Sequence, residues 1–449
     1  VARAIRTQYR HFVVDEYQDV SPLQQRLLDL WLGGRKELCV VGDPAQTIYS
    51  FDGATSGYLT GFQRRYPEAK VVQLVRDYRS TPQVVSLANS LLRSGKVTGV
   101  QLVAQASPGP AVAFRAFLDD AAEAEAVAAR IRDLAGEGVE ASEVAVLFRT
   151  NGQSEPVENA LAAAGIPYQV RGGERFFSRR EVRQALALLK SQARVESAEA
   201  PLEVIHSVLS GLGWTSQAPG ERGAVRERWE SLDALAVLAQ ELLQTSASNL
   251  PEVVALIEAR AEVGHSPTAT GVTLASLHSA KGLEWEAVFL IGLADGLVPI
   301  SLAVAGPEVA EERRLLYVGV TRAKRHLQLS YAKARTVGGS ANRRVSRFLN
   351  GIWPAAEQVA KQAKGLAVPN QSDLSPEEAA RFDQLRDWRL EVARASGRPA
   401  FTVLTDLTLR ALASRCPADA KQLAAIPGIG PVKIEQYGKD LLDLLTGAG

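Results

Sequence analysis

The sequence predicts an α/β protein with parallel sheets, a helical insert and a helical C-terminal unit. The first indication is a pair of short apolar runs, HFVVDE at 11–16 and LCVVGD at 38–43, each ending in acidic residues. Such runs are typical of buried parallel strands. The second indication is the segment between them, SPLQQRLLDLWL, whose apolar residues recur at helical spacing. Together they predict a βαβ unit, in which ligands bind at the carboxyl ends of the strands.

Strand and helix signals continue to alternate along the chain. The first long helix is expected to begin at Ser21-Pro22, because serine caps helices and proline suits a first turn. Further strands are predicted at 70–75, 111–117, 143–149, 271–277, 287–293 and 326–332, and helices at 81–92, 121–138 and 311–324. The stretch 181–262 has helical periodicity and no clear strand, which predicts a separate helical domain, and residues 376–445 predict a compact helical unit.

Composition narrows the class of protein. The chain has 449 residues, of which 46% are hydrophobic and 22% charged, so two to four soluble globular domains are expected. No apolar run approaches the roughly 18 residues of a membrane span. The start, VARAIRTQYR, has no export signal, so a cytoplasmic protein without a membrane partner is expected. The net charge of +1 neither favours nor excludes nucleic-acid binding.

Two cysteines, Cys39 and Cys416, lie far apart in apolar settings. We expect both to be buried free thiols rather than a disulfide or metal ligands. With five scattered histidines, they offer no zinc-binding spacing.

Polar residues follow both of the first two strands. Asp15 and Glu16 could hold Mg²⁺ and orient the water that attacks a nucleotide phosphate, although two acids after an apolar run are also typical of a solvated loop. The Gln46 amide can hydrogen-bond both a phosphate oxygen and a water. Tyr49 and Phe51, on a glycine-bounded turn, are either core residues or stacking platforms for unpaired bases.

Six sequence blocks in fixed order give these residues a more specific interpretation. The blocks are DEYQD (15–19), GDPAQTIYSFDGA (42–54), RDYRSTPQVV (76–85), LFRTNGQSEPVENALAAAGIPYQVRGG (147–173), VTLASLHSAKGLEWEAVFLIGL (272–293) and EERRLLYVGVTRAKRHL (311–327). They resemble motifs II, III, IV, IVa, V and VI of superfamily 1A DNA helicases, the UvrD, Rep and PcrA group. The resemblance covers about residues 1–353.

The resemblance implies an ATP-dependent, Mg²⁺-dependent DNA helicase or translocase that moves 3′ to 5′ on single-stranded DNA in repair. Expected partners are single-stranded DNA, junctions of single- and double-stranded DNA, and repair proteins. It also implies two RecA-like motor domains. The expected division is 1–92 for part of the first motor domain, 93–189 and 269–353 for the second, 190–268 for a helical insert, 354–375 for a linker and 376–449 for a C-terminal domain.

The family's site residues carry over position by position. Asp15 would place Mg²⁺, Glu16 would be the catalytic base, and Gln46 would couple the γ-phosphate to DNA. Arg79 and the arginine finger Arg322 would reach the γ-phosphate, whose developing charge guanidinium groups match well. The other expected contacts are Tyr78 with adenine, Glu284 with the ribose or nucleotide, and Tyr49, Phe51, Arg149, Asn151 and His278 with DNA. The family usually has tryptophan near Phe51.

A second resemblance covers residues 385–442, which look like an HRDC domain. Within it, Gly428, Gly430 and Lys433 of IPGIGPVK either face a DNA phosphate or form a tight turn between helices. A UvrD-like motor with a C-terminal HRDC domain resembles the second UvrD-type helicase group of actinobacteria. That group has a four-cysteine module before the HRDC domain, whereas residues 351–375 contain no cysteine.

No G-x-x-x-x-G-K-[ST] phosphate loop and no Met occur in the chain. We therefore expect the chain to start inside the first motor domain and to be inactive by itself, while a longer parent protein is active. The short insert leaves the strength of unwinding open. The alternative is a DNA-binding or regulatory module with a degenerate motor; a nuclease fusion is disfavoured, because no clustered Asp, Glu and Lys set occurs near the C-terminus.

Overall fold

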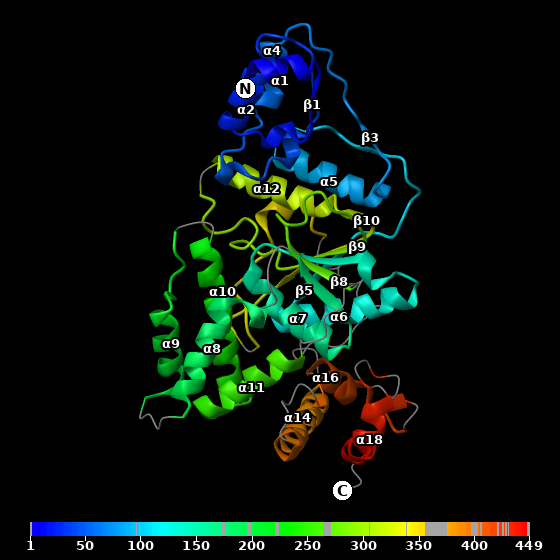
Figure 1. Ribbon diagram of the computed structural model, residues 1–449. Coiled ribbons are helices and arrows are strands. Elements are labelled where there is room, and N and C mark those ends of the chain that lie inside the picture. The colour runs from blue at the N-terminus through cyan, green and yellow to red at the C-terminus, as the bar shows by residue number, and fades with distance from the viewer. Residues whose placement is uncertain are drawn as a thin grey trace.

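The computed structural model describes residues 2–446 except 96, 98, 172–175, 195–198, 221–223, 264–270, 305, 338, 355–374, 397–402, 405, 420–421, 424–425, 427–428 and 430. Almost all of the predicted linker, together with Gly428 and Gly430, lies outside the described residues. In Figure 1 an N-terminal lobe sits above a central sheet, with a helical lobe beside the sheet and a C-terminal bundle below.

The central sheet has six parallel strands in the order β5-β10-β9-β6-β8-β7. The strands are β5 (Ala113–Phe117), β6 (Val144–Phe148), β7 (Tyr168–Arg171), β8 (Val272–Ser276), β9 (Trp285–Leu290) and β10 (Ala323–Ala332). Helices α5 (Pro82–Gly95) and α12 (Gly306–Val320) cover one face, and α6 (Asp120–Gly136) and α7 (Ser154–Ala163) cover the other. This is the predicted α/β architecture.

The central strand β6 shows how the sequence builds this sheet. Its five residues, VAVLF, are all buried, as expected for a strand covered on both faces. Val144, Val146 and Phe148 join the cluster under α6 and α7, whereas Ala145 and Leu147 join the cluster under α5 and α12. Burying each large side chain contributes roughly 1.5–3 kcal/mol, so the loops at the strand ends stand on a rigid platform.

The N-terminal lobe contains the predicted βαβ unit. Strands β1 (Phe12–Val14) and β2 (Leu38–Val40) pair in parallel, with Phe12 opposite Leu38. Between them, α2 (Pro22–Leu32) begins as predicted, because the Ser21 hydroxyl accepts the Gln24 N–H and the Gln24 side chain accepts the Ser21 N–H. The other elements of this lobe are α1 (Ala2–Gln8), η1 (Tyr17–Asp19), η2 (Pro44–Gln46), η3 (Ser50–Asp52), α3 (Gly57–Thr60) and α4 (Phe62–Arg65).

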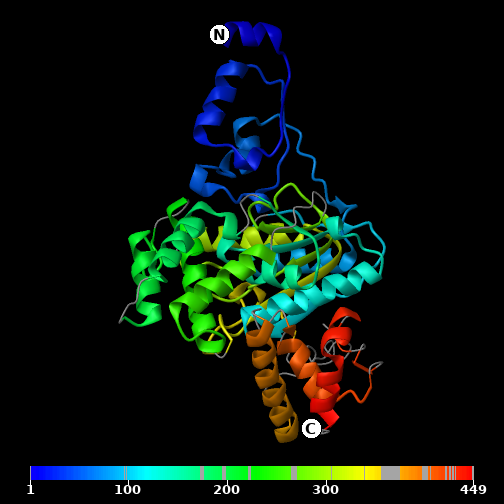
Figure 2. The ribbon, with the colours of Figure 1, turned by 60° about the horizontal axis from the view of Figure 1, so that its bottom comes forward.

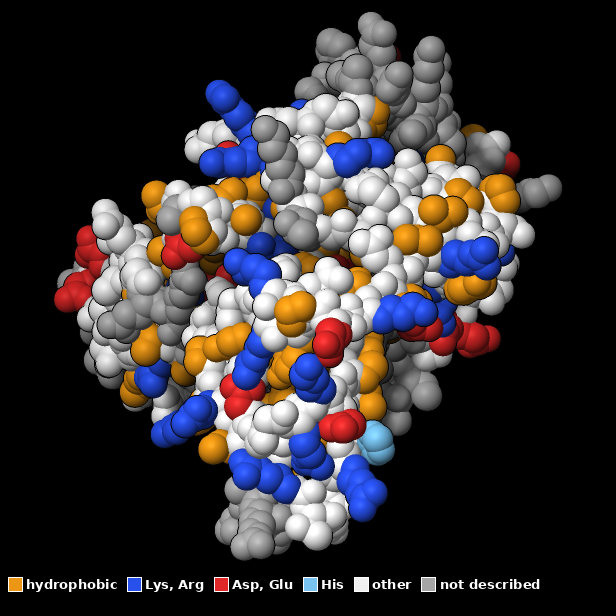
Figure 3. Space-filling model, turned by 90° about the horizontal axis from the view of Figure 1, so that it is seen from above, with side chains coloured by type: hydrophobic (Ala, Val, Ile, Leu, Met, Phe, Trp, Pro, Cys, Tyr) orange, Lys and Arg blue, Asp and Glu red, His pale blue; other side chains and the backbone are white. Residues whose placement is uncertain are grey.

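Two expectations for this lobe are wrong. Residues 70–75 do not form a strand; only β3 (Arg76–Asp77) pairs, with β4 (Val103–Ala104), and Leu74 is 75% exposed. A strand needs a neighbour for its backbone groups. The Val75 carbonyl accepts the Val103 N–H at 2.7 Å, but no described strand pairs with residues 70–74. Cys39 is exposed rather than buried, because it faces the same open side of the sheet as its register partner Val13. In Figure 3, which looks down on this end of the molecule, apolar side chains lie among lysines and arginines.

The two helical regions form as predicted. Helices α8 (Arg180–Gln192), α9 (Pro201–Gly211), α10 (Ala224–Thr245) and α11 (Leu250–Val263) enclose their own apolar core beside the sheet. The C-terminal bundle contains α14 (Pro376–Ser396), α16 (Asp406–Arg415) and α18 (Pro431–Thr446) around a further core. The remaining short helices are η4 (Ala141–Glu143), η5 (Asn151–Gln153), η6 (Phe176–Ser178) and η7 (Arg347–Leu349). No helix within the described ranges has the length and apolar character to cross a bilayer.

Helix α5 packs with the central sheet, although the predicted division puts residues 1–92 in the first motor domain. The Ser80 hydroxyl donates to the Ala323 carbonyl at 2.7 Å, and the Thr81 N–H donates to the Lys324 carbonyl at 2.9 Å. Val84, Leu91 and their neighbours on α5 then share a core with α12. The domain division stays a prediction, and this packing favours a first boundary before α5.

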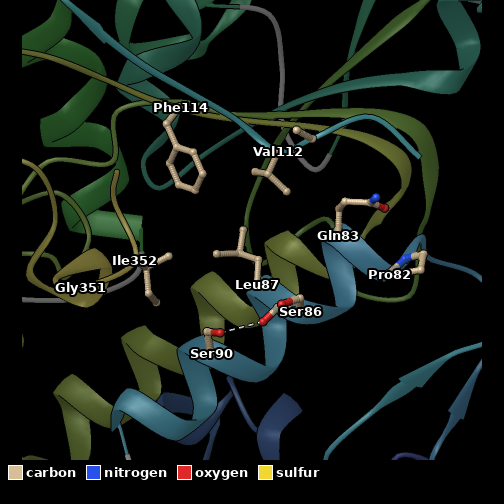
Figure 4. A pocket seen from close by; sticks show the side chains of 10 residues that line it. Pro82, Gln83, Ser86, Leu87, Ser90, Val112, Phe114, Gly351 and Ile352 are labelled. Atoms are coloured by element: carbon tan, nitrogen blue, oxygen red, sulfur yellow. Dashed lines mark hydrogen bonds between the residues drawn. The ribbon is translucent and has the colours of Figure 1, made fainter. Parts of the chain in front are cut away.

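A pocket of about 580 Å³ opens between α5 and the edge strand β5. Leu87, Val112, Phe114 and Ile352 give it an apolar lining (Figure 4). The Ser90 hydroxyl donates to the carbonyl of Ser86 at 2.8 Å (Figure 4). None of the predicted site residues lines this pocket.

Candidate active site between the N-terminal lobe and the central sheet

The end of β1 holds two exposed carboxylates next to each other. The Glu16 N–H donates to Asp15 Oδ1 at 2.8 Å. Glu16 itself has φ 51° and ψ 39°, a left-handed conformation that is uncommon for a residue with a Cβ and costs on the order of 1 kcal/mol. The Gln18 amide donates to Glu16 Oε2 at 2.6 Å.

The end of β2 is joined to these carboxylates. Gln18 Oε1 accepts the Asp43 N–H at 3.0 Å, and a Cβ on Gly42 would lie 2.4 Å from that oxygen, so a larger residue there would displace the Gln18 amide. Asp43 caps η2 through the Ala45 N–H at 2.9 Å. Gln46 Nε2 donates to Asp43 Oδ2 at 3.1 Å, which turns this amide back toward the strand ends.

Lys281, which follows β8 of the central sheet, reaches across to this lobe. Its Nζ lies 3.1 Å from Glu16 Oε2 and donates to the Gln46 carbonyl at 3.0 Å. It forms an ion pair with Asp19 as well and lies 5.2 Å from the centre of the Tyr49 ring. Burial raises the pKa of Asp19, and Lys281 opposes that rise. The sequence analysis predicted no role for Lys281. The only indication of one was its place in SAKG, within the block that resembles motif V.

A second group of charges lies beside the first. Arg79 forms an ion pair with Glu284, whose Oε1 is also 3.4 Å from Lys324 Nζ. Arg322 is buried and donates to the carbonyls of Leu283 at 2.9 Å and Val318 at 3.0 Å.

Burial, and next the charge of Arg79, lower the pKa of Arg322 to about 10, while Glu16 in the other lobe opposes that shift. Arg79, Glu284, Arg322 and Glu16 therefore share one electrostatic environment. Tyr78, which precedes Arg79 in the sequence, is 72% exposed.

Three predicted DNA-contacting residues form one aromatic cluster, made of Tyr49, Phe51 and His278. Their ring centres lie 5.9 Å (Tyr49–Phe51), 6.0 Å (Phe51–His278) and 6.4 Å (Tyr49–His278) apart. The Tyr49 hydroxyl donates to the His278 carbonyl at 3.3 Å, and the Phe51 side chain is 56% exposed. Burial, and then the charge of Arg149, lower the pKa of His278 to about 3, so its ring is neutral at physiological pH.

Among the other predicted DNA contacts, Arg149 interacts with this cluster through its charge, which opposes protonation of His278. Arg149 Nη2 lies 2.7 Å from Glu312 Oε1 in an ion pair with little solvent exposure, which leaves its guanidinium engaged within the protein. The Asn151 carbonyl accepts from Arg179 Nη2 at 3.1 Å. Lys433 lies on α18 in the C-terminal bundle, where burial lowers its pKa.

The carboxylates at the end of β1 suit a Mg²⁺ ion that is bound largely through a nucleotide. Within the part of the chain that the structure describes, no group of three or more His, Cys, Asp or Glu side chains could hold a metal ion. Mg²⁺ commonly uses one or two carboxylates and completes its shell with phosphate oxygens and water. Asp15 fits this mode, because it is an exposed carboxylate at a strand end.

Comparison with known families accounts for most of the chain. UvrD-like helicase C-terminal domains match residues 72–219 and 214–334, UvrD/REP helicase N-terminal domains match residues 1–67, and HRDC domains match residues 378–445. The chain is 50% identical to ATP-dependent DNA helicase UvrD2 of Mycobacterium tuberculosis, covering 100% of this chain and 68% of that protein.

The chain belongs to the UvrD-like helicase family. It is also 29% identical to DNA helicase II of Escherichia coli, covering 77% of this chain and 59% of that protein. Among solved structures, D. radiodurans RecQ HRDC domain 3 is 39% identical over 16% of this chain and 93% of that domain, with a TM-score of 0.16. The family assignment and the C-terminal HRDC domain predicted from the motifs are confirmed.

Proposed function

We propose that this UvrD-like chain is the part of an ATP-dependent DNA helicase that couples hydrolysis to single-stranded DNA. The observation that carries the proposal is the meeting of two lobes at Glu16. The carboxylate of Glu16 lies 3.1 Å from Lys281 of the central sheet and shares an electrostatic environment with Arg322. Residues from motifs II, V and VI therefore meet at one junction between the N-terminal lobe and the central sheet.

In this proposal each side chain acts at a stated atom. Glu16 accepts the proton of the attacking water, and Gln46 holds that water and the γ-phosphate through its amide. Arg79 and Arg322 offset the charge that develops on the γ-phosphate oxygens, which is the largest part of catalysis in phosphoryl transfer. Asp15 would hold Mg²⁺, which would supply further positive charge to the phosphates when bound.

The nucleotide base and sugar are assigned to neighbouring groups. Tyr78 is exposed and free to stack on adenine, and Glu284 reaches the ribose or nucleotide from the end of the loop before β9. In the structure Glu284 is paired with Arg79, so nucleotide binding would redistribute this ion pair. Arg79 would therefore change its ion-pair partner when the γ-phosphate is present.

Single-stranded DNA is assigned to the aromatic cluster. The exposed Phe51 offers a ring to a base, and a base of any sequence gains roughly 1–3 kcal/mol by stacking. Arg149 and Asn151 lie on the adjoining loop, but the ion pair of Arg149 with Glu312 favours a structural role for that arginine. Gly428, Gly430 and Lys433 stay candidate DNA contacts of the HRDC domain.

The wider role is part of the same proposal. The family resemblance implies movement from 3′ to 5′, action at junctions of single- and double-stranded DNA, and work with repair proteins. Because residues 1–449 contain no phosphate-loop sequence, we propose that this chain alone does not turn over ATP and that the full-length protein does.

The test is ATP hydrolysis by the full-length protein with and without oligo(dT), followed by strand displacement on duplexes with either a 3′ or a 5′ single-stranded tail. Turnover that rises with oligo(dT), and displacement only from the 3′-tailed duplex, would support the proposal. DNA binding with no turnover would instead support a regulatory module with a degenerate motor. Turnover by residues 1–449 alone would refute the proposed inactivity of this chain.

A further inference from the structure

Four polar contacts across the two lobes hold the segment from Gln46 to Phe51, which carries the predicted sensor amide and two aromatic rings. From the central sheet, Lys281 holds the Gln46 carbonyl and His278 accepts the Tyr49 hydroxyl. From α12, Arg314 Nε donates to the Thr47 carbonyl at 2.7 Å, and Glu311 accepts the Ser50 N–H at 3.0 Å. Any rearrangement of this segment must therefore change its contacts with the central sheet and with α12.

Lys281 differs from the residues that make the other three contacts, because it contacts both the carboxylates after β1 and the aromatic cluster. On one side its ammonium group pairs with Glu16 and Asp19. On the other side it lies over the Tyr49 ring at 5.2 Å, where a cation is attracted to the face of the ring. Only 8% of its side chain and 19% of the Asp19 side chain are exposed, so water screens that pair weakly, whereas the Glu16 side chain is 56% exposed.

Lys281 is also tied to the aromatic cluster through its backbone. The His278 carbonyl accepts both the Lys281 N–H at 3.2 Å and the Tyr49 hydroxyl at 3.3 Å. A base that enters the cluster must contact rings whose positions are fixed through this shared carbonyl. A shift of Tyr49 or of the His278 backbone would therefore move the ammonium group that pairs with Glu16.

Asp19 makes the position of Lys281 costly to change. Its Oδ2 pairs with Lys281, while its Oδ1 is buried without a hydrogen-bond partner. Without the lysine this half-buried carboxylate would lose its nearest cation. The ammonium group is therefore restricted to a small region between Asp19, Glu16 and Tyr49.

We propose that Lys281 is a positioning residue through which DNA in the Tyr49–Phe51–His278 cluster controls the orientation of Glu16. This inference rests on the proposed function, since it assigns the stimulating contact within that same site. Lys281 touches neither the phosphates nor the water in this scheme; it acts by holding or releasing the Glu16 carboxylate.

The experiment measures ATPase kcat of the full-length protein with and without oligo(dT) for wild type, Lys281→Met and Lys281→Arg. Methionine keeps most of the side-chain volume without the charge, and arginine keeps the charge and the contact with the ring. Coupling between two sites is typically worth about 5- to 150-fold, so we expect Lys281→Met to lower the stimulation ratio about tenfold. Lys281→Arg should keep most of that ratio. Lys190→Met, at a solvent-exposed ion pair, is the control and should match wild type.

The outcomes separate this inference from the proposed function. If wild type shows no stimulation, the proposed function fails and the inference fails with it. If wild type is stimulated and Lys281→Met has the same ratio, with both rates lowered in parallel, Lys281 is only structural and the inference is overturned. If Lys281→Met does not fold, Asp19→Asn removes the opposite charge and should lower the ratio as well; an unchanged ratio there would also overturn the inference.

Discussion

Changing Glu312 to glutamine is expected to destabilise the central α/β domain by about 3 kcal/mol, the lower end of the cost of breaking a buried ion pair. Glu312 Oε1 lies 2.7 Å from Arg149 Nη2, and Glu312 Oε2 accepts the Ile300 N–H at 3.1 Å. Only 8% of the Glu312 side chain and 17% of the Arg149 side chain are exposed. Because Arg149 retains some solvent, the lower end of the range applies.

The assay is thermal unfolding of the chain with Glu312→Gln, followed by circular dichroism. For a domain of 150–250 residues, 3 kcal/mol corresponds to a fall in Tm of roughly 6–12 °C. Glu258→Gln is the control, because Glu258 pairs with Lys190 at a site where both side chains are about half exposed. Such surface pairs contribute about 0–1 kcal/mol, so the control should shift Tm by only a few degrees.

An unchanged Tm in Glu312→Gln would refute the view that this ion pair supports the domain. The same experiment separates two roles of Arg149. If Arg149 binds a DNA phosphate, Arg149→Met should reduce the salt dependence of single-stranded DNA binding by about 0.7 in log–log slope. If its role is the pair with Glu312, Arg149→Met should lower Tm and leave that slope unchanged.

Three further predictions concern the candidate active site. The pKa of His278 falls from 6.5 to about 3 on folding, so the unfolded chain alone takes up this proton as pH drops through that range. Stability should fall from pH 6.5 toward 3 in pH-dependent melts, and His278→Gln should lessen that fall; an equally steep loss would contradict it. Phe51→Ala should weaken oligo(dT) binding about 5- to 150-fold by fluorescence anisotropy. Phe51→Trp, which keeps an aromatic ring at this position, should bind oligo(dT) as wild type does. Arg322→Lys should lower ATPase kcat of the full-length protein about a thousandfold with little change in KM, and a change confined to KM would argue against an arginine finger.

The sequence was sufficient where the deciding interactions are local. The apolar residues of 143–149 predicted a strand, which the structure has as β6, and Ser21 with Pro22 predicted the start of α2. Both succeed because side-chain alternation and helix capping depend on residues within a few positions. The ordered motif blocks likewise predicted the family, since they are contiguous in sequence.

Only the tertiary structure decided which partners these residues have. Val71 and Val72 suit a strand, yet no described strand pairs with them and they are exposed. Arg149 resembles a DNA contact in its motif, but Glu312 pairs with it from 163 positions away. Lys281 meets Asp19 across 262 positions, which no local pattern specifies. Periodicity determines what a segment can become, whereas pairing between distant charges and strands depends on how the whole chain packs.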